Sequence, residues 1–83
     1  MSIELTHLDG VATLVLRGEI DRSTTVELQA SLLELLAAAR AVLDLRDATW
    51  LDQAAVDSVL AAYRLRNLMG SPLTLLHGEA RMA

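Results

Sequence analysis

The sequence contains no cysteine, no lysine and no phenylalanine, and Trp50 and Tyr63 are its only tryptophan and tyrosine. The absence of cysteine excludes disulfide bonds and thiolate metal sites. The absence of lysine leaves seven arginines against eleven acidic residues, and this net charge of −4 argues against the basic face that nucleic-acid-binding proteins present. Because 53% of the residues are hydrophobic and so few are aromatic, the core must be aliphatic.

Metal-binding and membrane-spanning signals are also missing. His7 and His77 are the only histidines and lie at opposite ends of the chain, so we expect neither a metal site nor a cofactor. The most apolar run, residues 35–45, is interrupted by Arg40 and Asp44 and is too short to cross a bilayer. The N-terminal segment lacks the basic and apolar regions of a signal peptide. We therefore expect a cytoplasmic protein without membrane insertion.

The chain is 83 residues long, which allows one small domain over residues 1–83. Residues 2–8 and 11–17 are rich in β-forming side chains. They flank Asp9 and Gly10, a dipeptide that favours a two-residue hairpin turn because both turn residues must adopt positive φ. An antiparallel pair of strands is therefore predicted at the start of the chain.

The next segment has the spacing of an amphipathic helix, which we expect over residues 24–39. Thr24 followed three residues later by Glu27 matches a capping box at its start. The apolar residues that repeat at helical spacing, and that we expect to face the core, are Leu28, Leu32, Leu35, Leu36 and Ala39.

Two further strands and a second helix follow. Residues 41–45 form a short aliphatic run that fits a buried parallel strand. A helix is predicted to begin after Asp52, a good N-cap, and to end near Gly70, a typical C′ residue. Residues 72–76 fit another parallel strand, whereas the tail 77–83 shows no periodicity. The stripe of this second helix is predicted to contain Val56, Val59, Leu60 and Tyr63.

The predicted order of elements is therefore β-β-α-β-α-β. Right-handed β-α-β crossovers place both helices on the same face if the strand order continues one way. The sequence thus predicts the α/β class, with a small open mixed sheet, helices packed on one face and the other face covered poorly or not at all.

Acidic residues gather where such a sheet binds ligands, beyond the carboxyl ends of its parallel strands. The four carboxylates Asp44, Asp47, Asp52 and Asp57 invite an acid/base or Mg²⁺ interpretation. Capping explains Asp52, however, and the positive end of the helix dipole explains Asp57. The sequence also has no glycine-rich phosphate loop, nucleophile elbow or zinc-type histidine pair. An enzyme or nucleotide-binding protein is therefore the disfavoured alternative.

The order and spacing of these segments resemble a STAS domain, the fold of bacterial anti-sigma-factor antagonists. The resemblance covers roughly residues 3–77 and implies a non-catalytic protein-interaction domain. It rests on GEID at 18–21, VLDL at 42–45, WLD at 50–52, AAYR at 61–64, and Gly70 followed by an aliphatic strand.

One segment departs from the family pattern. After the position of Leu51 the family typically reads Asp-Ser-Ser-Gly, and the second serine is phosphorylated by a partner kinase that is also the anti-sigma factor. Here the four positions are Asp52, Gln53, Ala54 and Ala55. Ala54 carries no hydroxyl, so the resemblance implies that the usual switch, a phosphate that blocks docking through charge and bulk, is absent.

The resemblance implies two classes of protein partner. The first is an anti-sigma factor with a kinase fold, which would regulate transcription indirectly. The second is the ATPase subunit of an ABC-type lipid transporter. The implied interface residues are Asp21, Asp52, Gln53, Ala54, Asp57 and Ser58, of which Ser58 is also a weaker candidate for phosphorylation.

STAS domains usually continue with another helix after the last strand predicted here. We therefore expect apolar surface, which that helix would cover, to be exposed. Such a surface predicts pairing with a second copy, as a homodimer, or with an obligate partner.

Overall fold

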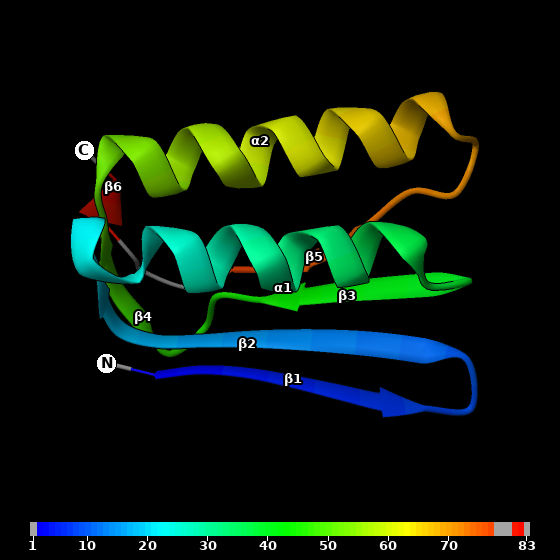
Figure 1. The fold of residues 1–83 in the computed structure, drawn as a ribbon, viewed down its shortest axis with the longest axis horizontal. Coiled ribbons are helices and arrows are strands. Elements are labelled where there is room, and N and C mark those ends of the chain that lie inside the picture. Colours follow the sequence, from blue (N-terminus) through cyan, green and yellow to red (C-terminus); the bar gives the residue numbers. More distant parts are fainter. Residues whose placement is uncertain (1, 78–80, 83) are drawn as a thin grey trace.

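Two helices lie on one face of a six-stranded mixed sheet, which confirms the predicted α/β class (Figure 1). The computed structural model of the protein describes residues 2–77 and 81–82. The elements are β1 (Ser2–Leu8), β2 (Val11–Ile20), the 3₁₀ turn η1 (Arg22–Thr24), α1 (Thr25–Ala37), β3 (Arg40–Asp44), β4 (Ala48–Leu51), α2 (Gln53–Leu68), β5 (Thr74–Leu76) and β6 (Arg81–Met82).

The N-terminal hairpin forms at the predicted dipeptide. Asp9 has φ 51° and Gly10 has φ 78°, so both turn residues take the positive values that a two-residue turn requires. The antiparallel register closes with Leu8 opposite Val11.

Strand β2 is the centre of the sheet. Its residues 11–17 pair with β1, residues 11–15 pair in parallel with β3, and residues 18–20 pair in parallel with β4. β5 then pairs with β3, and β6 with β4. The sequence pattern did not predict β4 or β6, because strands of four and two residues are too short to display an alternation.

The core is aliphatic, as the composition predicts, and lies between the sheet and the helices. Alternate residues of β2 and β3 point into it, including Leu14, Leu16 and Leu43, which are all fully buried. The opposite face of the sheet carries half-buried residues such as Val15 and Val42, and no helix of the described residues covers it (Figure 1). This confirms the predicted one-sided arrangement.

Helix α1 begins differently from the capping-box prediction. The hydroxyl of Thr24 donates to the carbonyl oxygen of Asp21 at 2.8 Å and makes no capping bond to the helix. Asp21 caps the preceding 3₁₀ turn instead, and Thr24 is buried. Of the predicted core residues, Leu28, Leu32 and Leu35 are buried, Leu36 is half-buried, and Ala39 lies exposed beyond the helix end.

The buried stripe of α2 is also different from the predicted one. Leu60 and Tyr63 are 43% and 37% exposed, and of the predicted stripe only Val59 is buried. The observed buried residues are Ala55, Val59, Ala62 and Arg66. Small alanines let α2 approach its neighbours closely, and apolar residues on several sides of the helix made the stripe ambiguous in the sequence.

Arg66 is a buried side chain that the sequence analysis missed. Its guanidinium donates to the carbonyl oxygens of Leu36 at 3.1 Å, Ala38 at 2.7 Å and Ala39 at 3.3 Å. Its Nε–H donates to the carbonyl oxygen of Ser71 at 2.8 Å. An arginine in the last turn of a helix commonly satisfies free carbonyls, and that position was the available signal.

Candidate functional site

Two loops meet at the carboxyl end of the sheet. Ile20 and Leu51 are paired residues at the ends of the parallel strands β2 and β4. The next residues are Asp21 and Asp52, and the Asp52 N–H donates to the Ile20 carbonyl at 3.1 Å. Parallel pairing therefore brings together two residues of the predicted interface that are 31 positions apart in the sequence.

Asp52 caps α2, as its sequence position predicts. Its carboxylate accepts a hydrogen bond from the backbone N–H of Ala55 at 2.9 Å. The carbonyl of Asp52 accepts the first intrahelical bond, from the Val56 N–H at 3.0 Å. The carboxylate is thus occupied in holding the helix start, where one of the free N–H groups would otherwise lack a partner.

Asp21 is held in an equally local arrangement. Its carboxylate accepts bonds from the hydroxyl of Ser23 at 2.6 Å and from the backbone N–H of Ser23 at 3.0 Å. The hydroxyl bond, followed by the backbone bond, lowers the pKa of Asp21 below its ordinary value. Asp21 therefore keeps its negative charge near the start of α2.

Gln53 and Ala54 occupy the first turn of α2 and are both exposed. The Gln53 side-chain amide donates to the carboxylate of Asp57 at 2.8 Å, one turn further along the helix. Ala54 presents only a methyl group to solvent. The position predicted to correspond to the family phosphoacceptor is therefore exposed and carries no hydroxyl.

Ser58, the weaker candidate for phosphorylation, lies one turn after Ala54 on α2. It is half-buried, and its hydroxyl donates to the Ala54 carbonyl at 2.9 Å within α2. It lies opposite Gln29 of α1, in the groove between the two helices. The structure thus places Ser58 at an edge of the predicted interface and not at its centre.

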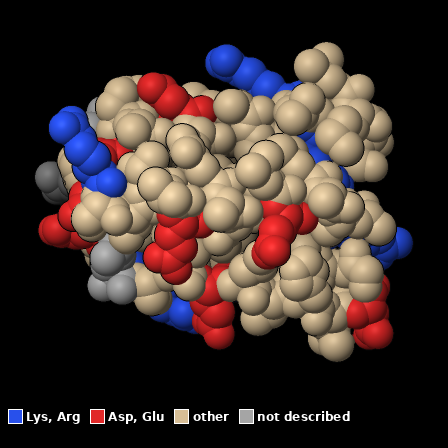
Figure 2. Space-filling view, in the orientation of Figure 1, with Lys and Arg blue, Asp and Glu red and all other residues tan. Residues whose placement is uncertain are grey.

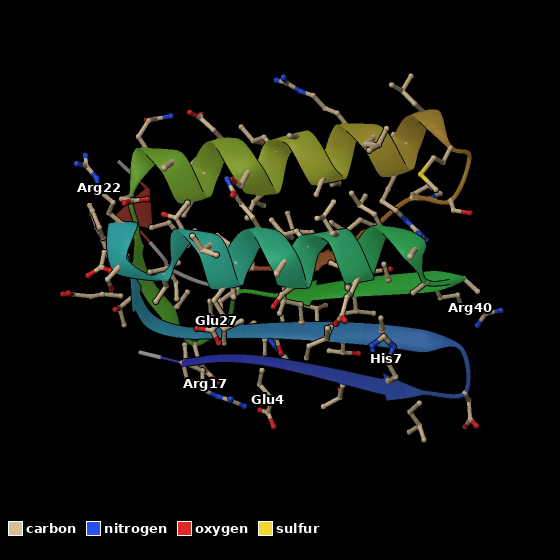
Figure 3. The ribbon with its side chains drawn as sticks, viewed as in Figure 1. Glu4, His7, Arg17, Arg22, Glu27 and Arg40 are labelled. Carbon is tan, nitrogen blue, oxygen red and sulfur yellow. The ribbon has the colours of Figure 1, made fainter. Side chains whose placement is uncertain are left out.

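Asp44 and Asp47 belong to a separate set of charges on the uncovered side of the sheet. Asp44 accepts two side-chain bonds from Arg46, at 3.0 and 2.9 Å. These bonds, followed by one from the Arg46 backbone N–H, lower the pKa of Asp44. Figure 3 shows Arg17 and Glu4 on the strand side, and their ion pair measures 2.9 Å. Arg17 also lies 3.9 Å from Asp47.

The acidic residues that the structure describes therefore do not converge on one centre. Within residues 2–77 and 81–82, no group of three or more histidine, cysteine or acidic side chains could hold a metal ion. In the same part of the chain no helix is both long and apolar enough to span a bilayer.

The family is shown by comparison with known proteins. Residues 3–83 match the family model described as "Mlab, STAS domain". The chain belongs to the STAS family. No curated protein sequence matches it.

Solved structures share the STAS fold. The unphosphorylated anti-sigma factor antagonist SpoIIAA superposes with a TM-score of 0.75 and 17% identity, covering 89% of this chain and 71% of that one. An anti-sigma factor antagonist from Mycobacterium paratuberculosis gives 0.65 and 21%, over 88% and 84% of the two chains. An antagonist STAS domain from Rhodobacter sphaeroides gives 0.68 and 14%, over 90% and 84%.

Several apolar side chains of this STAS domain are exposed. Leu68 is 85% exposed, and Leu60, Leu65, Met69 and Leu75 are also in contact with solvent. Most of them lie on or just beyond α2. Pairing with a second copy over this surface stays a prediction.

Proposed function

We propose that this STAS domain is a non-catalytic, cytoplasmic interaction domain that docks onto an anti-sigma factor with a kinase fold and thereby regulates transcription. The similar solved structures that carry the name of anti-sigma factor antagonists support this general role. The proposed docking surface consists of Asp21, Asp52, Gln53, Ala54, Asp57 and Ser58.

The exposed methyl group of Ala54 is the observation that carries the proposal. It lies in the first turn of α2, next to the Asp52 cap, and parallel strand pairing brings Asp21 to the same end of the sheet. Because Ala54 has no hydroxyl, a kinase cannot add the phosphate that would block this surface. We infer a domain that stays competent to dock.

The acidic residues support a non-catalytic role. Asp52 and Asp21 accept capping bonds from nearby backbone N–H groups, and Asp44 is paired with Arg46. Each carboxylate thus has a structural partner that accounts for its presence. A general acid or base would instead need a pKa displaced toward neutrality, and the displaced carboxylates here move in the opposite direction.

A transporter ATPase is the second candidate partner. The description of the matching family model names Mlab and does not name an anti-sigma factor antagonist. Ala54, which has no hydroxyl, favours a STAS branch that does not use phosphorylation at this position. We propose the same docking surface for either partner, so the identity of the bound protein separates the two functions.

The test is affinity capture with the tagged domain from its source cells, followed by reconstitution with the purified partner. Recovery of a kinase-fold anti-sigma factor supports the first proposal, and recovery of a transporter ATPase supports the second. Ala54→Asp should weaken binding of the purified partner at least about tenfold, because it adds charge and bulk to the interface. Ala39→Asp, on an exposed alanine after α1, is the matched control and should bind normally.

A second variant separates the two partners by chemistry. Ala54→Ser restores a hydroxyl at an exposed position of the first helical turn. A kinase-fold partner should then transfer one phosphate to the variant and none to the wild type, as intact-mass analysis would show. Binding that is unaffected by Ala54→Asp would show that the docking surface has been assigned to the wrong place.

A further inference from the structure

Strand β1 lies at an edge of the sheet, and in the described part of the chain no strand pairs with its outer side (Figure 1). The hairpin closes with Leu8 opposite Val11, so the even-numbered residues of β1 exchange backbone hydrogen bonds with β2. The alternate residues Ile3, Leu5 and His7 therefore direct their backbone N–H and C=O groups away from β2. This edge offers a row of backbone donors and acceptors to a further strand.

β1 has none of the features that usually protect an exposed edge. Natural edge strands carry lysine, proline or a β-bulge, or they are very short. β1 contains neither lysine nor proline, and its seven residues pair with β2 in an unbroken register. Glu4, the only acidic residue of β1, forms an ion pair with Arg17 at 2.9 Å. The edge is therefore open to the addition of a strand.

Acidic side chains of α1 lie beside this edge, on the helix side of the sheet. Glu27 and Glu34 are exposed and lie on the side of α1 that is turned away from α2. Glu34 lines a hollow of about 350 Å³ together with His7 and Gly10. Figure 3 labels Glu27 toward the Arg17 end of the hairpin, and Figure 2 shows acidic side chains between α1 and the hairpin. The edge is thus bordered by negative charge near both of its ends.

These charges disfavour a second copy as the added strand. Antiparallel pairing of two β1 strands would bring Glu27 and Glu34 of both copies to the same face of the seam, and the chain contains no lysine to offset them. We propose that β1 receives an extended segment of a partner protein as an additional antiparallel strand. This segment carries lysine or arginine opposite Ile3 and His7 and an apolar residue opposite the half-buried Leu5. These three positions point to the helix side, because directly paired residues share a face of the sheet.

The spacing of the charges fits this arrangement. Glu27 and Glu34 are separated by seven residues of α1, a rise of about 10 Å. Two strand positions four residues apart are separated by about 13 Å, and long basic side chains bridge the difference of about 3 Å. β1 and α2 lie on opposite sides of α1 (Figure 1). The proposal therefore goes beyond docking at the start of α2 and does not rest on it.

Two designed peptides test the edge with the whole protein. The sequence Thr-Lys-Thr-Leu-Thr-Lys-Thr has the proposed pattern and the length of β1, and its counterpart carries glutamate in place of lysine. In an NMR titration, the lysine peptide should shift the backbone amide signals of Ile3, Leu5 and His7 and bind with a Kd about tenfold lower than the glutamate peptide. Equal binding of the two peptides, no binding of either, or shifts confined to other residues would contradict the proposal.

Backbone methylation of the lysine peptide separates strand addition from attraction by charge alone. In the added strand, the N–H of the central leucine donates to the carbonyl of Leu5, whereas the N–H groups of the neighbouring threonines point away from β1. N-methylation of the leucine should raise the Kd at least about tenfold, because it removes a hydrogen bond and places a methyl group against the edge. N-methylation of a neighbouring threonine is the matched control and should change the Kd less than about twofold. Equal effects would show that the peptide does not bind as a strand.

Substitutions in the protein locate the binding. His7→Pro removes an outward N–H at an edge position, where proline is compatible with a strand, and should weaken the lysine peptide about tenfold relative to His7→Ala, which keeps that N–H. Glu34→Lys should abolish the preference for the lysine peptide, since one glutamate and one lysine then border the edge. Glu19→Lys changes an exposed glutamate beyond the part of β2 that pairs with β1 and should keep the preference. Equal binding by the two His7 variants, or a preference that survives Glu34→Lys, would overturn the proposal.

Discussion

The two ends of α2 are held in different ways. At the N-terminal end, the Asp52 carboxylate bonds the Ala55 N–H three residues away, and Gln53 bonds Asp57 four residues away. At the C-terminal end, the buried guanidinium of Arg66 reaches carbonyls of Leu36, Ala38 and Ala39, 27 to 30 residues earlier in the chain. The N-terminal end of α2 is thus held by hydrogen bonds between near neighbours at the surface. The C-terminal end is held by hydrogen bonds to a segment that is distant in the sequence.

The difference separates stability from recognition along a single helix. Local bonds at an exposed end can change without removing a contact between distant elements, so the proposed docking surface is free to vary in sequence. Arg66 instead joins the end of α1 to the segment after α2, and three of its four hydrogen bonds close contacts between elements distant in the sequence. We therefore expect substitutions at the two ends to differ in the property that they change.

The largest effect is expected for Arg66→Met. Methionine fills similar space but leaves four carbonyl contacts unmade in a partly buried setting, so the free energy of unfolding should fall by about 3 kcal/mol. Urea unfolding followed by Trp50 fluorescence and by circular dichroism measures this change.

Arg64→Met is the matched control for this prediction. Arg64 is exposed two residues earlier on the same helix, and its substitution should change stability by less than about 0.5 kcal/mol. Equal losses for the two variants would mean that the buried guanidinium is not what holds this end of the helix, and the contrast between the two ends would disappear.

A smaller effect is expected for Asp52→Ala at the other end. Removing the cap leaves the Ala55 N–H without its side-chain partner and should cost about 1 kcal/mol of stability. Asp52→Asn keeps an acceptor of the same shape and should lose only a fraction of that. Urea unfolding of the three proteins side by side gives the order.

The outcome also bears on the docking surface. Asp52→Asn should fold nearly normally, so a change in partner binding by this variant would not be caused by unfolding. An Asp52→Asn protein as unstable as Asp52→Ala would show that the negative charge at the helix start, and not the hydrogen bond, holds this end.

Much of the fold could be predicted because turn residues and apolar spacing in the sequence indicate the same elements. Asp9-Gly10 fixes the hairpin, Gly70 with φ 77° follows the end of α2, and α1 buries the leucines that its apolar spacing indicates. At the candidate site, the sequence identified Asp52 as a cap. The pairing of β2 with β4 then explains why Asp21 lies at the same end of the sheet.

The remaining features depend on tertiary contacts that leave little trace in one sequence. The four residues of β4 are a strand only because β2 continues past β3 and offers them backbone partners. Arg66 resembles a solvated arginine until the carbonyls that follow α1 surround it. Ser58 turns toward α1 because the buried stripe of α2 is built on alanines, which a count of large apolar residues overlooks.

The smallest effect is expected at the ion pair of Asp44 and Arg46, which is as local as the caps. Because the folded pKa of Asp44 is lowered, its contribution to stability is complete above the unfolded pKa of about 3.9 and is lost as pH falls through the folded value. Arg46 is exposed, so solvent screens the ion pair and the loss of stability should be small. Urea unfolding between pH 5 and pH 3, as an order-of-magnitude window about that pKa, should show that the free energy of unfolding falls less steeply with acid for Asp44→Asn than for the wild type.

Arg46→Gln removes the main cause of the lowered pKa of Asp44 and should flatten the fall in the free energy of unfolding to a similar degree. A wild-type slope in both variants would mean that the pair adds nothing to folding. A wild-type slope in Arg46→Gln alone would assign the shift to the Arg46 backbone N–H, which makes this pair a backbone-anchored local contact like the caps of Asp21 and Asp52.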